Sequence, residues 1–258
     1  MRNTAPRFAI VIPMKDEADA CTALLDGCAD AVSTLAPFEI CVTDDGSSDG
    51  TYEKLRAWAD TRPDIAMTVL RHPTAAGQSA AVHSAVRAAR APIIVMLDGD
   101  GQNPPEELPN LLAPLLAEGA DPKLGLVAGQ RIKRADSASK RIASRLANGL
   151  RRTLLADGTR DTGCGLKAFR REAFLALPYF DHMHRYLPAL FQRDGWTIAH
   201  VDVAHRERET GQSKYTNFGR ALVGVSDLLG VAWLIRRKRR VLPREVERIE
   251  LGSAPWRI

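Results

Sequence analysis

Residues 92–106 read PIIVMLDGDGQNPPE, and this stretch decides the fold. Pro92–Leu97 is a continuous apolar run with the length of one strand, which is typical of a strand buried on both faces of a sheet. The run stops at Asp98-Gly99-Asp100, and Pro104-Pro105-Glu106 then starts a helix. A buried strand that ends in carboxylates and leads into a helix predicts an α/β sheet with chemistry at its carboxyl edge.

The segments around this stretch alternate between strand and helix. Apolar, β-branched runs predict strands at Phe8–Pro13, Glu39–Thr43, Ala66–Arg71 and Leu124–Ala128. Helical spacing predicts helices at Asp19–Leu35, Thr51–Trp58, Gln78–Ala89 and Glu106–Leu116. This order predicts βαβ units and a mostly parallel sheet flanked by helices, with ligands beyond the carboxyl ends of the strands.

Composition and charge narrow the class of protein. The chain has 258 residues, 45% of them hydrophobic and 26% charged, which suits one folded α/β domain rather than a disordered chain. Its four cysteines have no metal-ligand or disulfide spacing, so we expect reduced, buried thiols in a cytoplasmic protein. The formal net charge of +5 favours anionic partners such as nucleotide phosphates, nucleic acid or an acidic membrane surface.

No segment reads as a signal peptide or a membrane span. The apolar run near the N-terminus is too short for a signal peptide. The longest apolar candidate, Ala221–Ile235, is interrupted by Ser226 and Asp227, so it should not cross a bilayer. We therefore expect a soluble or peripheral protein.

Asp98 and Asp100 are candidate metal ligands. Two carboxylates that flank a glycine at a strand end can both reach one hard cation, Mg²⁺ or Mn²⁺, and leave positions open for diphosphate oxygens. Gly99 between them lets a ligand approach the backbone closely. The alternative interpretation is a plain acidic turn.

The turns after the first two strands carry further candidates. Asp45, in the turn Asp44–Gly50, can accept a hydrogen bond from a nucleobase N–H or a ribose hydroxyl. Ser48 and Asp49 in the same turn are also good helix-capping residues, and both roles can hold together. Glu17, after the first strand, can complement the N-terminus of the helix that follows.

These motifs, in this order, resemble the inverting glycosyltransferase family 2, whose members have the GT-A fold. The matching segments are IVIPMKDE, TDDGSSDGT, AAGQSAAV, VMLDGDGQNPPE, AGQR, DTGCGLKAFRRE, HRYLPAL and RERETGQSKY. The last three resemble the dolichyl- or polyprenyl-phosphate hexosyltransferases, typified by dolichyl-phosphate mannosyltransferase. The resemblance implies an α/β, GT-A (Rossmann-like) domain over residues 1–216. Residues 217–258 then hold an amphipathic helix, a polybasic run and a tail.

The resemblance also implies a site. It assigns the nucleoside pocket to Pro13, Lys15, Glu17, Thr43 and Asp45, and the metal to Asp98, Asp100 and Gln102. Gly99 then touches the nucleotide through its backbone. The resemblance also places Arg131, Arg208 and Lys214 around the diphosphate and the acceptor phosphate. Their cationic groups offset the clustered negative charge. The relatives have an aromatic residue and Asn where this chain has Lys15 and Asp16, so UDP and GDP both stay open as the donor nucleotide.

The implied reaction moves a hexose-type sugar from a UDP- or GDP-sugar to polyprenyl phosphate with inversion. The resemblance implies that Asp100, Arg208 and Lys214 are catalytic residues. Mg²⁺ or Mn²⁺ acts as Lewis acid on the leaving diphosphate. An ionised phosphate acceptor needs no strong base, whereas a hydroxyl acceptor on a saccharide or lipid does, and Asp161 is the candidate base. The alternative is that Asp161 anchors its loop near Arg160 or Arg170.

Two segments combine apolar and basic faces. Ser137–Leu155 has apolar residues every four positions beside three arginines, and Phe218–Ile235 runs into the basic residues 236–240. Both patterns favour contact with an anionic membrane surface, with packing on the core as the alternative. No nucleic-acid-binding fold accompanies the basic run. We therefore expect a cytoplasmic protein, peripheral on the inner face of the cell membrane.

Two other classes of protein were compared with this interpretation. A sugar nucleotidyltransferase needs a Gly-rich, basic loop after the first strand, and VIPMKDEAD has no glycine there. A degenerate nucleotide-sugar-binding protein remains an alternative, against which the complete set of Asp98, Asp100, Arg208 and Lys214 argues.

Overall fold

One seven-stranded sheet forms the centre of the computed structural model, which describes residues 5–132, 154–155, 157–204 and 217–238. The strand order is β3-β2-β1-β4-β6-β5-β7. The strands are β1 (Phe8–Met14), β2 (Phe38–Asp44), β3 (Ala66–Arg71), β4 (Ile93–Met96), β5 (Leu124–Arg131), β6 (Lys167–Arg170) and β7 (Thr197–Val203). Among these strands β6 runs antiparallel to both β4 and β5, and the other pairs are parallel.

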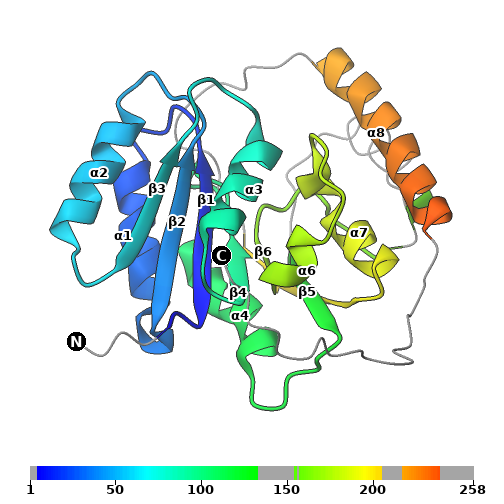
Figure 1. Cartoon of the computed structure of the whole chain (residues 1–258), viewed down its shortest axis with the longest axis horizontal. Helices are drawn as coiled ribbons and strands as arrows, with labels where there is room; N and C mark the ends of the chain where they lie inside the picture. Colours follow the sequence, from blue (N-terminus) through cyan, green and yellow to red (C-terminus); the bar gives the residue numbers. More distant parts are fainter. Residues whose placement is uncertain (1–4, 133–153, 156, 205–216, 239–258) are drawn as a thin grey trace, which may run out of the picture.

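Helices cover both faces of the sheet (Figure 1). The main helices are α1 (Cys21–Ala31), α2 (Thr51–Thr61), α3 (Gln78–Ala88), α4 (Leu108–Leu116), α6 (Arg171–Leu175), α7 (Leu187–Arg193) and α8 (Asn217–Arg237). Short 3₁₀ helices are η1 (Ser33–Leu35), η2 (Pro105–Glu107) and η3 (Met183–Arg185). Helices α1, α2 and α4 pack on one face, and α3, α6 and α7 pack on the other, where α8 lies against α7.

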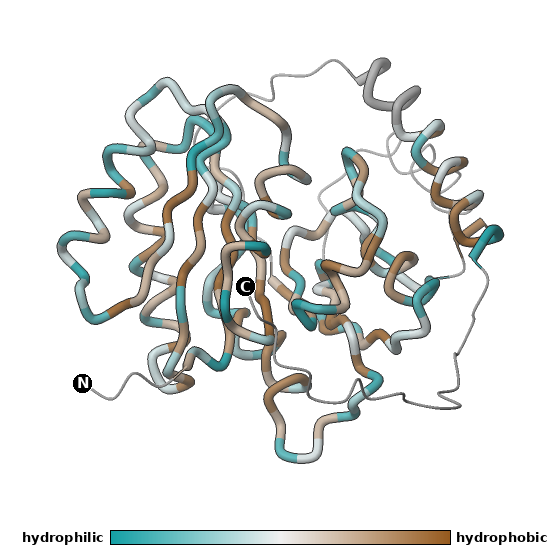
Figure 2. Tube along the Cα trace, viewed as in Figure 1, coloured by the Kyte–Doolittle hydropathy of each residue, from teal (hydrophilic) through white to brown (hydrophobic). Residues whose placement is uncertain are grey.

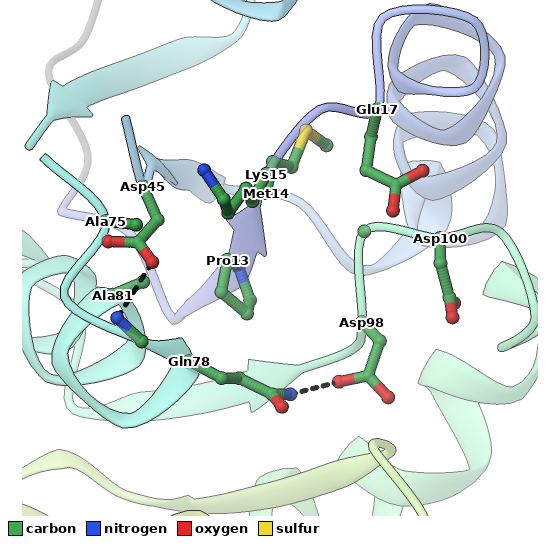
Figure 3. Close-up of a pocket in the computed structure, with 12 residues that line it drawn as sticks. Pro13, Met14, Lys15, Glu17, Asp45, Ala75, Gln78, Ala81, Asp98 and Asp100 are labelled. Carbon is green, nitrogen blue, oxygen red and sulfur yellow. Dashed lines mark hydrogen bonds between the residues drawn. The ribbon is translucent and has the colours of Figure 1, made fainter. Parts of the chain in front are cut away.

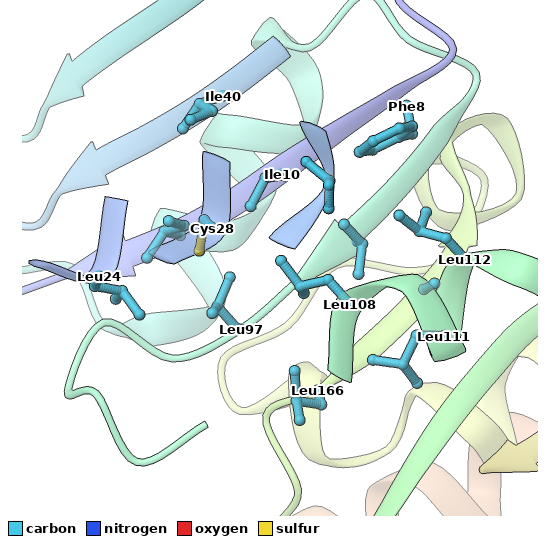
Figure 4. Close-up of a cluster of buried hydrophobic side chains, with 14 of the residues drawn as sticks. Phe8, Ile10, Leu24, Cys28, Ile40, Leu97, Leu108, Leu111, Leu112 and Leu166 are labelled. Carbon is cyan, nitrogen blue, oxygen red and sulfur yellow. The ribbon is translucent and has the colours of Figure 1, made fainter. Parts of the chain in front are cut away.

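Continuous apolar runs explain why the central strands form. All seven residues of β1 and all four of β4 are buried, so these strands contribute to the cores on both faces. Figure 2 shows the hydrophobic colour concentrated along the central strands. On the α1/α4 face, Ile10 and Ile40 of the sheet meet Leu24, Cys28 and Leu108 of the helices (Figure 4).

The structure confirms the predicted fold class, a mostly parallel sheet flanked by helices. The predicted helix Asp19–Leu35 is shorter and divided into α1 and η1, and the helix expected from Glu106 begins as η2. Two strands, β6 and β7, were not predicted. Their polar residues explain this: β6 begins with Lys167 and ends with Arg170, and β7 reads TIAHVDV. The division at residue 216 stays a prediction.

The order of the strands reverses between β1 and β4. From β1 the chain moves outward through β2 to β3, and then it returns to place β4 on the other side of β1. In open parallel sheets, ligands bind in the crevice beside such a switch point. The predicted site segments after β1 and β4 therefore meet at this crevice.

The remaining expectations concern cysteines and membrane spans. Cys21, Cys28, Cys41 and Cys164 are buried and free, as predicted for reduced thiols. Within the described residues, no helix combines the length and apolar character needed to cross a bilayer. Most of Ser137–Leu155, the basic residues 239–240 and the tail from Pro243 lie outside the described residues.

Candidate active site

A cleft of about 430 Å³ opens at the carboxyl ends of β1, β2 and β4 (Figure 3). Its lining includes seven residues predicted from the sequence: Pro13, Lys15, Glu17, Asp45, Asp98, Gly99 and Asp100. Five further residues complete it: Met14, Ala75, Gly77, Gln78 and Ala81. Residues that the resemblance assigned to a nucleoside pocket and to a metal site therefore share one cavity.

The wall of the cleft after β1 is held by the turn after β2. The Asp16 N–H donates to Ser47 Oγ at 2.8 Å, and the Glu17 N–H donates to Thr51 Oγ1 at 2.9 Å. In return, Asp16 Oδ1 accepts from the Ser48 N–H at 3.0 Å. These bonds fix the backbone beside Lys15 and Glu17, so the serines and threonine of DGSSDGT shape the cleft from outside it.

Asp45 holds the loop that enters α3. Its Oδ1 accepts from the Ala76 N–H at 2.8 Å and lies 2.7 Å from His72 Nδ1, and its Oδ2 accepts from the Gly77 N–H at 2.9 Å. Although burial raises the pKa of Asp45, these hydrogen bonds together hold that pKa below its ordinary value. The carboxylate is thus ionised and largely occupied by protein groups.

Asp98 and Asp100 project from the loop after β4, and both are half-buried. Burial raises the pKa of Asp98 above its ordinary value, and the charge of Asp100 raises it further. Lys167 and side-chain hydrogen bonds from Asn103 and Gln78 oppose this rise in the pKa of Asp98. The Gln78 bond, from Nε2 to Asp98 Oδ1, is 2.6 Å long (Figure 3).

This pair of carboxylates fits a hard divalent cation. Two carboxylates that repel each other in a partly desolvated position gain stability when a cation lies between them. The described part of the chain contains no cluster of three or more acidic, His or Cys side chains. Two carboxylates cannot fill the coordination sphere of Mg²⁺ or Mn²⁺, so water or diphosphate oxygens would complete it.

The loop before β6 packs directly behind Asp98. A Cβ placed on Gly165 would lie 2.1 Å from Asp98 Oδ2 and 2.7 Å from Asn103 Nδ2, so only glycine fits there. Lys167 is 3% exposed and donates through Nζ to the Cys164 carbonyl. Burial lowers the pKa of Lys167, whereas the charges of Asp98 and Asp161 raise it. On balance the pKa of Lys167 lies below its ordinary value. The motif DTGCGLK thus places a buried lysine close enough to Asp98 for their charges to interact.

Asp161 forms a bidentate ion pair with Arg131. The Arg131 Nε and Nη2 atoms donate to Asp161 Oδ2 and Oδ1 at 2.5 and 2.8 Å. Arg160 instead donates to Gln130 and Asp202, and Arg170 donates to the carbonyls of Leu124 and Asp121. The sequence analysis named Arg160 and Arg170 as anchoring partners, and the partner found is Arg131, which comes from β5.

Other predicted residues lie away from the cleft. Thr43 is fully buried within β2 and does not line the cleft. Gln102 is half-buried and donates its backbone N–H to Asp100 Oδ1 at 3.2 Å, but it is not a lining residue. Arg131 is likewise outside the lining. Arg208 and Lys214 lie outside the described residues.

The sequence analysis missed Gln78 and Lys167. Both occur in motifs that it quoted, AAGQSAAV and DTGCGLKAFRRE, but it gave neither side chain a role. For Gln78, the available signal was a polar residue directly after Gly77 at the start of a helix. For Lys167, the signal was a cation at the head of an otherwise apolar segment.

The segment DHMHRY, residues 181–186, supports the start of α3 from the other side. His184 Nδ1 lies 2.8 Å from Ser79 Oγ, which also accepts from the His184 N–H at 3.3 Å. Burial, together with the neighbouring positive charges of Lys167 and Arg185, lowers the pKa of His184 to about 3. A neutral imidazole therefore contacts Ser79, the residue that follows Gln78 in α3.

In open α/β sheets ligands bind in the crevice at the switch point, and in this chain that crevice carries the two carboxylates. The family model described as Glycosyl transferase family 2 matches residues 9–177. This match covers the cleft, both carboxylates and the loop before β6. The chain belongs to glycosyl transferase family 2.

Curated relatives extend the comparison beyond the family model. An undecaprenyl-phosphate 4-deoxy-4-formamido-L-arabinose transferase from Edwardsiella ictaluri (strain 93-146) is 34% identical over 208 residues, which are 80% of this chain and 62% of the relative. A protein of the same name from Yersinia pestis (strain Pestoides F) is 33% identical over 211 residues, covering 81% and 63%. This chain thus spans about three fifths of the length of these relatives.

Solved structures share the fold. A mannosyltransferase from Pyrobaculum calidifontis in complex with GDP-Man and Mn²⁺ has a TM-score of 0.61 and 22% identity, covering 93% of this chain and 67% of its own. Glucosyl-3-phosphoglycerate synthase from Mycobacterium tuberculosis in complex with Mg²⁺ and UDP has a TM-score of 0.63 and 18% identity, covering 89% and 79%. These similarities confirm the predicted GT-A fold class.

The close contact at Gly165 leads to a first prediction. Gly165→Ala should lower the free energy of unfolding by about 1 to 3 kcal/mol, because its Cβ overlaps the Asp98 carboxylate and forces one of them to move. Denaturant unfolding measures the change. The control is Gly230→Ala in α8, where a Cβ meets nothing within 4 Å and stability should hold or rise slightly. Equal stability of the two variants would contradict the packing described for Gly165.

The buried imidazole of His184 leads to a second prediction, which concerns the pH dependence of stability. Its pKa of about 3 in the folded protein lies below the ordinary value of 6.5, so between these values only the unfolded chain takes up the proton. Stability associated with His184 is therefore present above pH 6.5 and is lost as the pH falls towards 3. His184→Gln should flatten this dependence, measured as unfolding free energy against pH. An unchanged slope in the variant means that His184 is protonated in the folded protein.

Proposed function

We propose that this protein is a metal-dependent, inverting glycosyltransferase that moves a sugar from a UDP- or GDP-sugar to polyprenyl phosphate at a membrane surface. The observation that carries the proposal is the cleft in which Asp98 and Asp100 lie beside Lys15, Glu17 and Asp45. A nucleotide diphosphate needs this combination of metal ligands and a nucleoside wall at a switch point. The names of the curated relatives, undecaprenyl-phosphate transferases, support the lipid acceptor.

Asp98 and Asp100, with Gln102 close by, would hold a Mg²⁺ or Mn²⁺ ion, and that ion would supply Lewis-acid stabilisation to the leaving diphosphate. Lys15, whose Nζ donates to the Gly46 carbonyl at 3.3 Å, faces the nucleoside end of the cleft. Gly99 presents its backbone to the cleft between the two carboxylates. We assign the diphosphate and acceptor phosphate to the cationic groups of Arg131, Arg208 and Lys214.

The contacts of Asp161 favour a phosphate acceptor over a hydroxyl acceptor. Both of its carboxylate oxygens accept from Arg131, and the side chain is 8% exposed. A general base must reach the proton that it removes, and this ion pair holds Asp161 away from that task. An acceptor phosphate already carries the negative charge that attacks the sugar, so the reaction requires no base from Asp161.

The sugar is assigned here as hexose-type, and the names of the relatives add an amino-pentose derivative, 4-deoxy-4-formamido-L-arabinose, to the donors that need testing. The nucleotide stays open between UDP and GDP. Both occur in complexes of proteins that share the fold, one with GDP-Man and one with UDP.

Helix α8 supports a peripheral position on the inner face of the cell membrane. Leu228, Val231 and Ala232 are buried against the body of the protein. Val225, Leu229 and Trp233, spaced four residues apart, are 52%, 59% and 60% exposed and form one apolar stripe. This stripe ends next to Arg236 and Arg237, and the guanidinium of Arg237 lies 6.0 Å from the Trp233 ring. An apolar stripe with a cationic end suits an anionic lipid surface.

One residue of the basic run 236–240, Lys238, already forms an ion pair within the protein. Lys238 Nζ donates to Asp194 Oδ1 at 2.5 Å, and its side chain is only partly exposed. We therefore assign lipid contact to Arg236 and Arg237 among the described basic residues, and we assign to Lys238 the role of fastening α8 to the end of α7.

Transfer itself tests the proposal. Purified protein is incubated with a panel of UDP- and GDP-sugars, undecaprenyl phosphate, and Mn²⁺, Mg²⁺ or EDTA. We expect a lipid-extractable product that EDTA abolishes. Asp98→Ala and Asp100→Ala should reduce the rate by at least about 100-fold, because metal stabilisation of the diphosphate is worth several kcal/mol.

Asp64→Asn, at an exposed carboxylate that pairs with Arg62, is the matched control and should keep the wild-type rate. Full activity in either Ala variant overturns the metal assignment. Transfer to a saccharide but not to the lipid phosphate replaces the acceptor with a hydroxyl. Metal-dependent nucleotide binding without transfer to either acceptor supports a binding protein instead.

Vesicle flotation tests the role of α8. Leu229→Glu and Trp233→Glu should each weaken binding to anionic vesicles by about ten-fold or more, because each removes an apolar side chain from the lipid contact. Arg236→Glu/Arg237→Glu should weaken binding to anionic but not to neutral vesicles. The control is Tyr179→Glu, at an exposed aromatic outside α8. Unchanged binding of all three variants rules out α8 as the contact surface.

A further inference from the structure

Gln78 connects the two sides of the cleft. It is the first residue of α3, and its Nε2 donates to Oδ1 of Asp98, which follows β4, at 2.6 Å (Figure 3). Such a bond is strongest when the acceptor is a carboxylate. It fixes one oxygen of Asp98 and thereby limits the rotation of the whole carboxylate.

The backbone that presents Gln78 is held by Asp45. Residue 77, immediately before it, is a glycine with φ of +92°, a conformation that residues with a side chain rarely adopt. Both the Gly77 and the Ala76 N–H donate to the Asp45 carboxylate. Two hydrogen bonds from adjacent residues to one carboxylate define the position of the loop and, through it, the Cα of Gln78.

Asp45 is tied to the body of α3 as well. His72 Nδ1 lies 2.7 Å from Asp45 Oδ1, and His72 Nε2 lies 3.0 Å from Oγ of Ser84, in the second turn of the helix. Asp45 thus contacts the loop before α3 directly and α3 itself through His72. The end of β2, the start of α3 and the end of β4 form one chain of hydrogen bonds.

The hydrogen bonds that Asp45 already accepts limit how many it can make to a nucleotide. It accepts from three protein groups and is 4% exposed. A carboxylate offers about four acceptor positions, so Asp45 keeps about one for a nucleoside while the other three hold the loop and His72. Gln78, by contrast, is exposed to the cleft, and holding an exposed glutamine in one rotamer costs conformational entropy that its bond to Asp98 must offset.

A neutral donor is the appropriate partner for a metal ligand. An amide N–H orients a carboxylate without neutralising it, so the hydrogen bond from Gln78 does not itself compete with a cation for the charge of Asp98. Partners of this kind behind metal ligands typically change metal affinity by 10- to 100-fold when they are removed.

We infer that Gln78 is a positioning residue for Asp98, and that Asp45 acts on the same carboxylate through the loop 75–77. The nucleoside end and the metal end of the cleft are therefore one hydrogen-bonded unit, in which displacement of the loop by a nucleotide changes the affinity for the cation. The inference rests on the proposed function in one respect, the binding of a divalent cation by Asp98 and Asp100.

Mn²⁺ binding to the nucleotide-free full chain tests this inference without any transfer reaction. Free Mn²⁺ is measured by electron paramagnetic resonance during titration of the wild type, Gln78→Met, Asp45→Asn and the double variant. Gln78→Met keeps the length of the side chain and loses both amide donors, and it should weaken Mn²⁺ binding by about ten-fold. The control is Arg87→Met, on an exposed residue of the last turn of α3, which should bind Mn²⁺ as the wild type does.

The two variants together reveal whether Asp45 acts through Gln78. If it does, Asp45→Asn also weakens Mn²⁺ binding, and the double variant is no weaker than the more affected single variant, because both changes break the same chain of contacts. In parallel, UDP and GDP binding is measured by calorimetry in EDTA. Gln78→Met should leave this metal-free nucleotide binding unchanged, which separates positioning of Asp98 from general damage to the cleft.

Three results would overturn the inference, and they differ from one another. Wild-type Mn²⁺ affinity in Gln78→Met removes the positioning role. An Asp45→Asn variant that loses nucleotide affinity in EDTA but keeps its Mn²⁺ affinity makes Asp45 a direct nucleoside ligand. A wild-type protein that binds no Mn²⁺ at millimolar concentration removes the metal assignment of the proposed function and, with it, this inference.

Discussion

The partial burial of Asp98 beside Asp100 is the constraint on which the rest of the site depends. Burial and the neighbouring charge both raise the pKa of Asp98, so the folded chain must offset an unfavourable charge at the end of β4. It does so with the charge of Lys167 and with amide donors from Gln78 and Asn103. The absence of a side chain at Gly165 leaves room for the carboxylate. These residues come from three parts of the chain, the start of α3, the loop after β4 and the motif DTGCGLK, and together they fix the position of Asp98.

Sheet topology explains why such distant segments meet. Because β1 and β4 are adjacent and parallel, the loops that follow them emerge at the same edge, and β6 returns antiparallel beside β4 to bring Lys167 under that edge. The β2 turn then closes the wall by hydrogen bonds to residues 16–18. Strand order brings these segments together, and the hydrogen bonds between their side chains then fix the shape of the site.

The sequence predicted those parts of the site that depend on a short continuous stretch of residues. Continuous apolar runs identified β1 and β4, and the polar residues directly after β4 identified Asp98 and Asp100. Glu17 was assigned by the family resemblance, and all three residues line the cleft. Contacts between distant segments leave no periodic signal, so the Gln78–Asp98 bond and the Arg131–Asp161 pair were not predicted. Strand β6 was missed for a related reason, since Lys167 is buried by its tertiary partners rather than by its own hydrophobicity.

Helix α8 is joined to the same layer that supports the cleft, and this sets how the cleft faces a surface. Asp227 of α8 lies 3.1 Å from His182 Nδ1, and the Tyr186 hydroxyl donates to the Gly224 carbonyl at 3.3 Å. Between these two residues, His184 contacts Ser79 at the start of α3. The helix that carries the apolar stripe and the helix that carries Gln78 are thus packed through one short segment. If α8 contacts a lipid surface as proposed, side-chain packing through residues 182–186 determines how the cleft is oriented toward that surface.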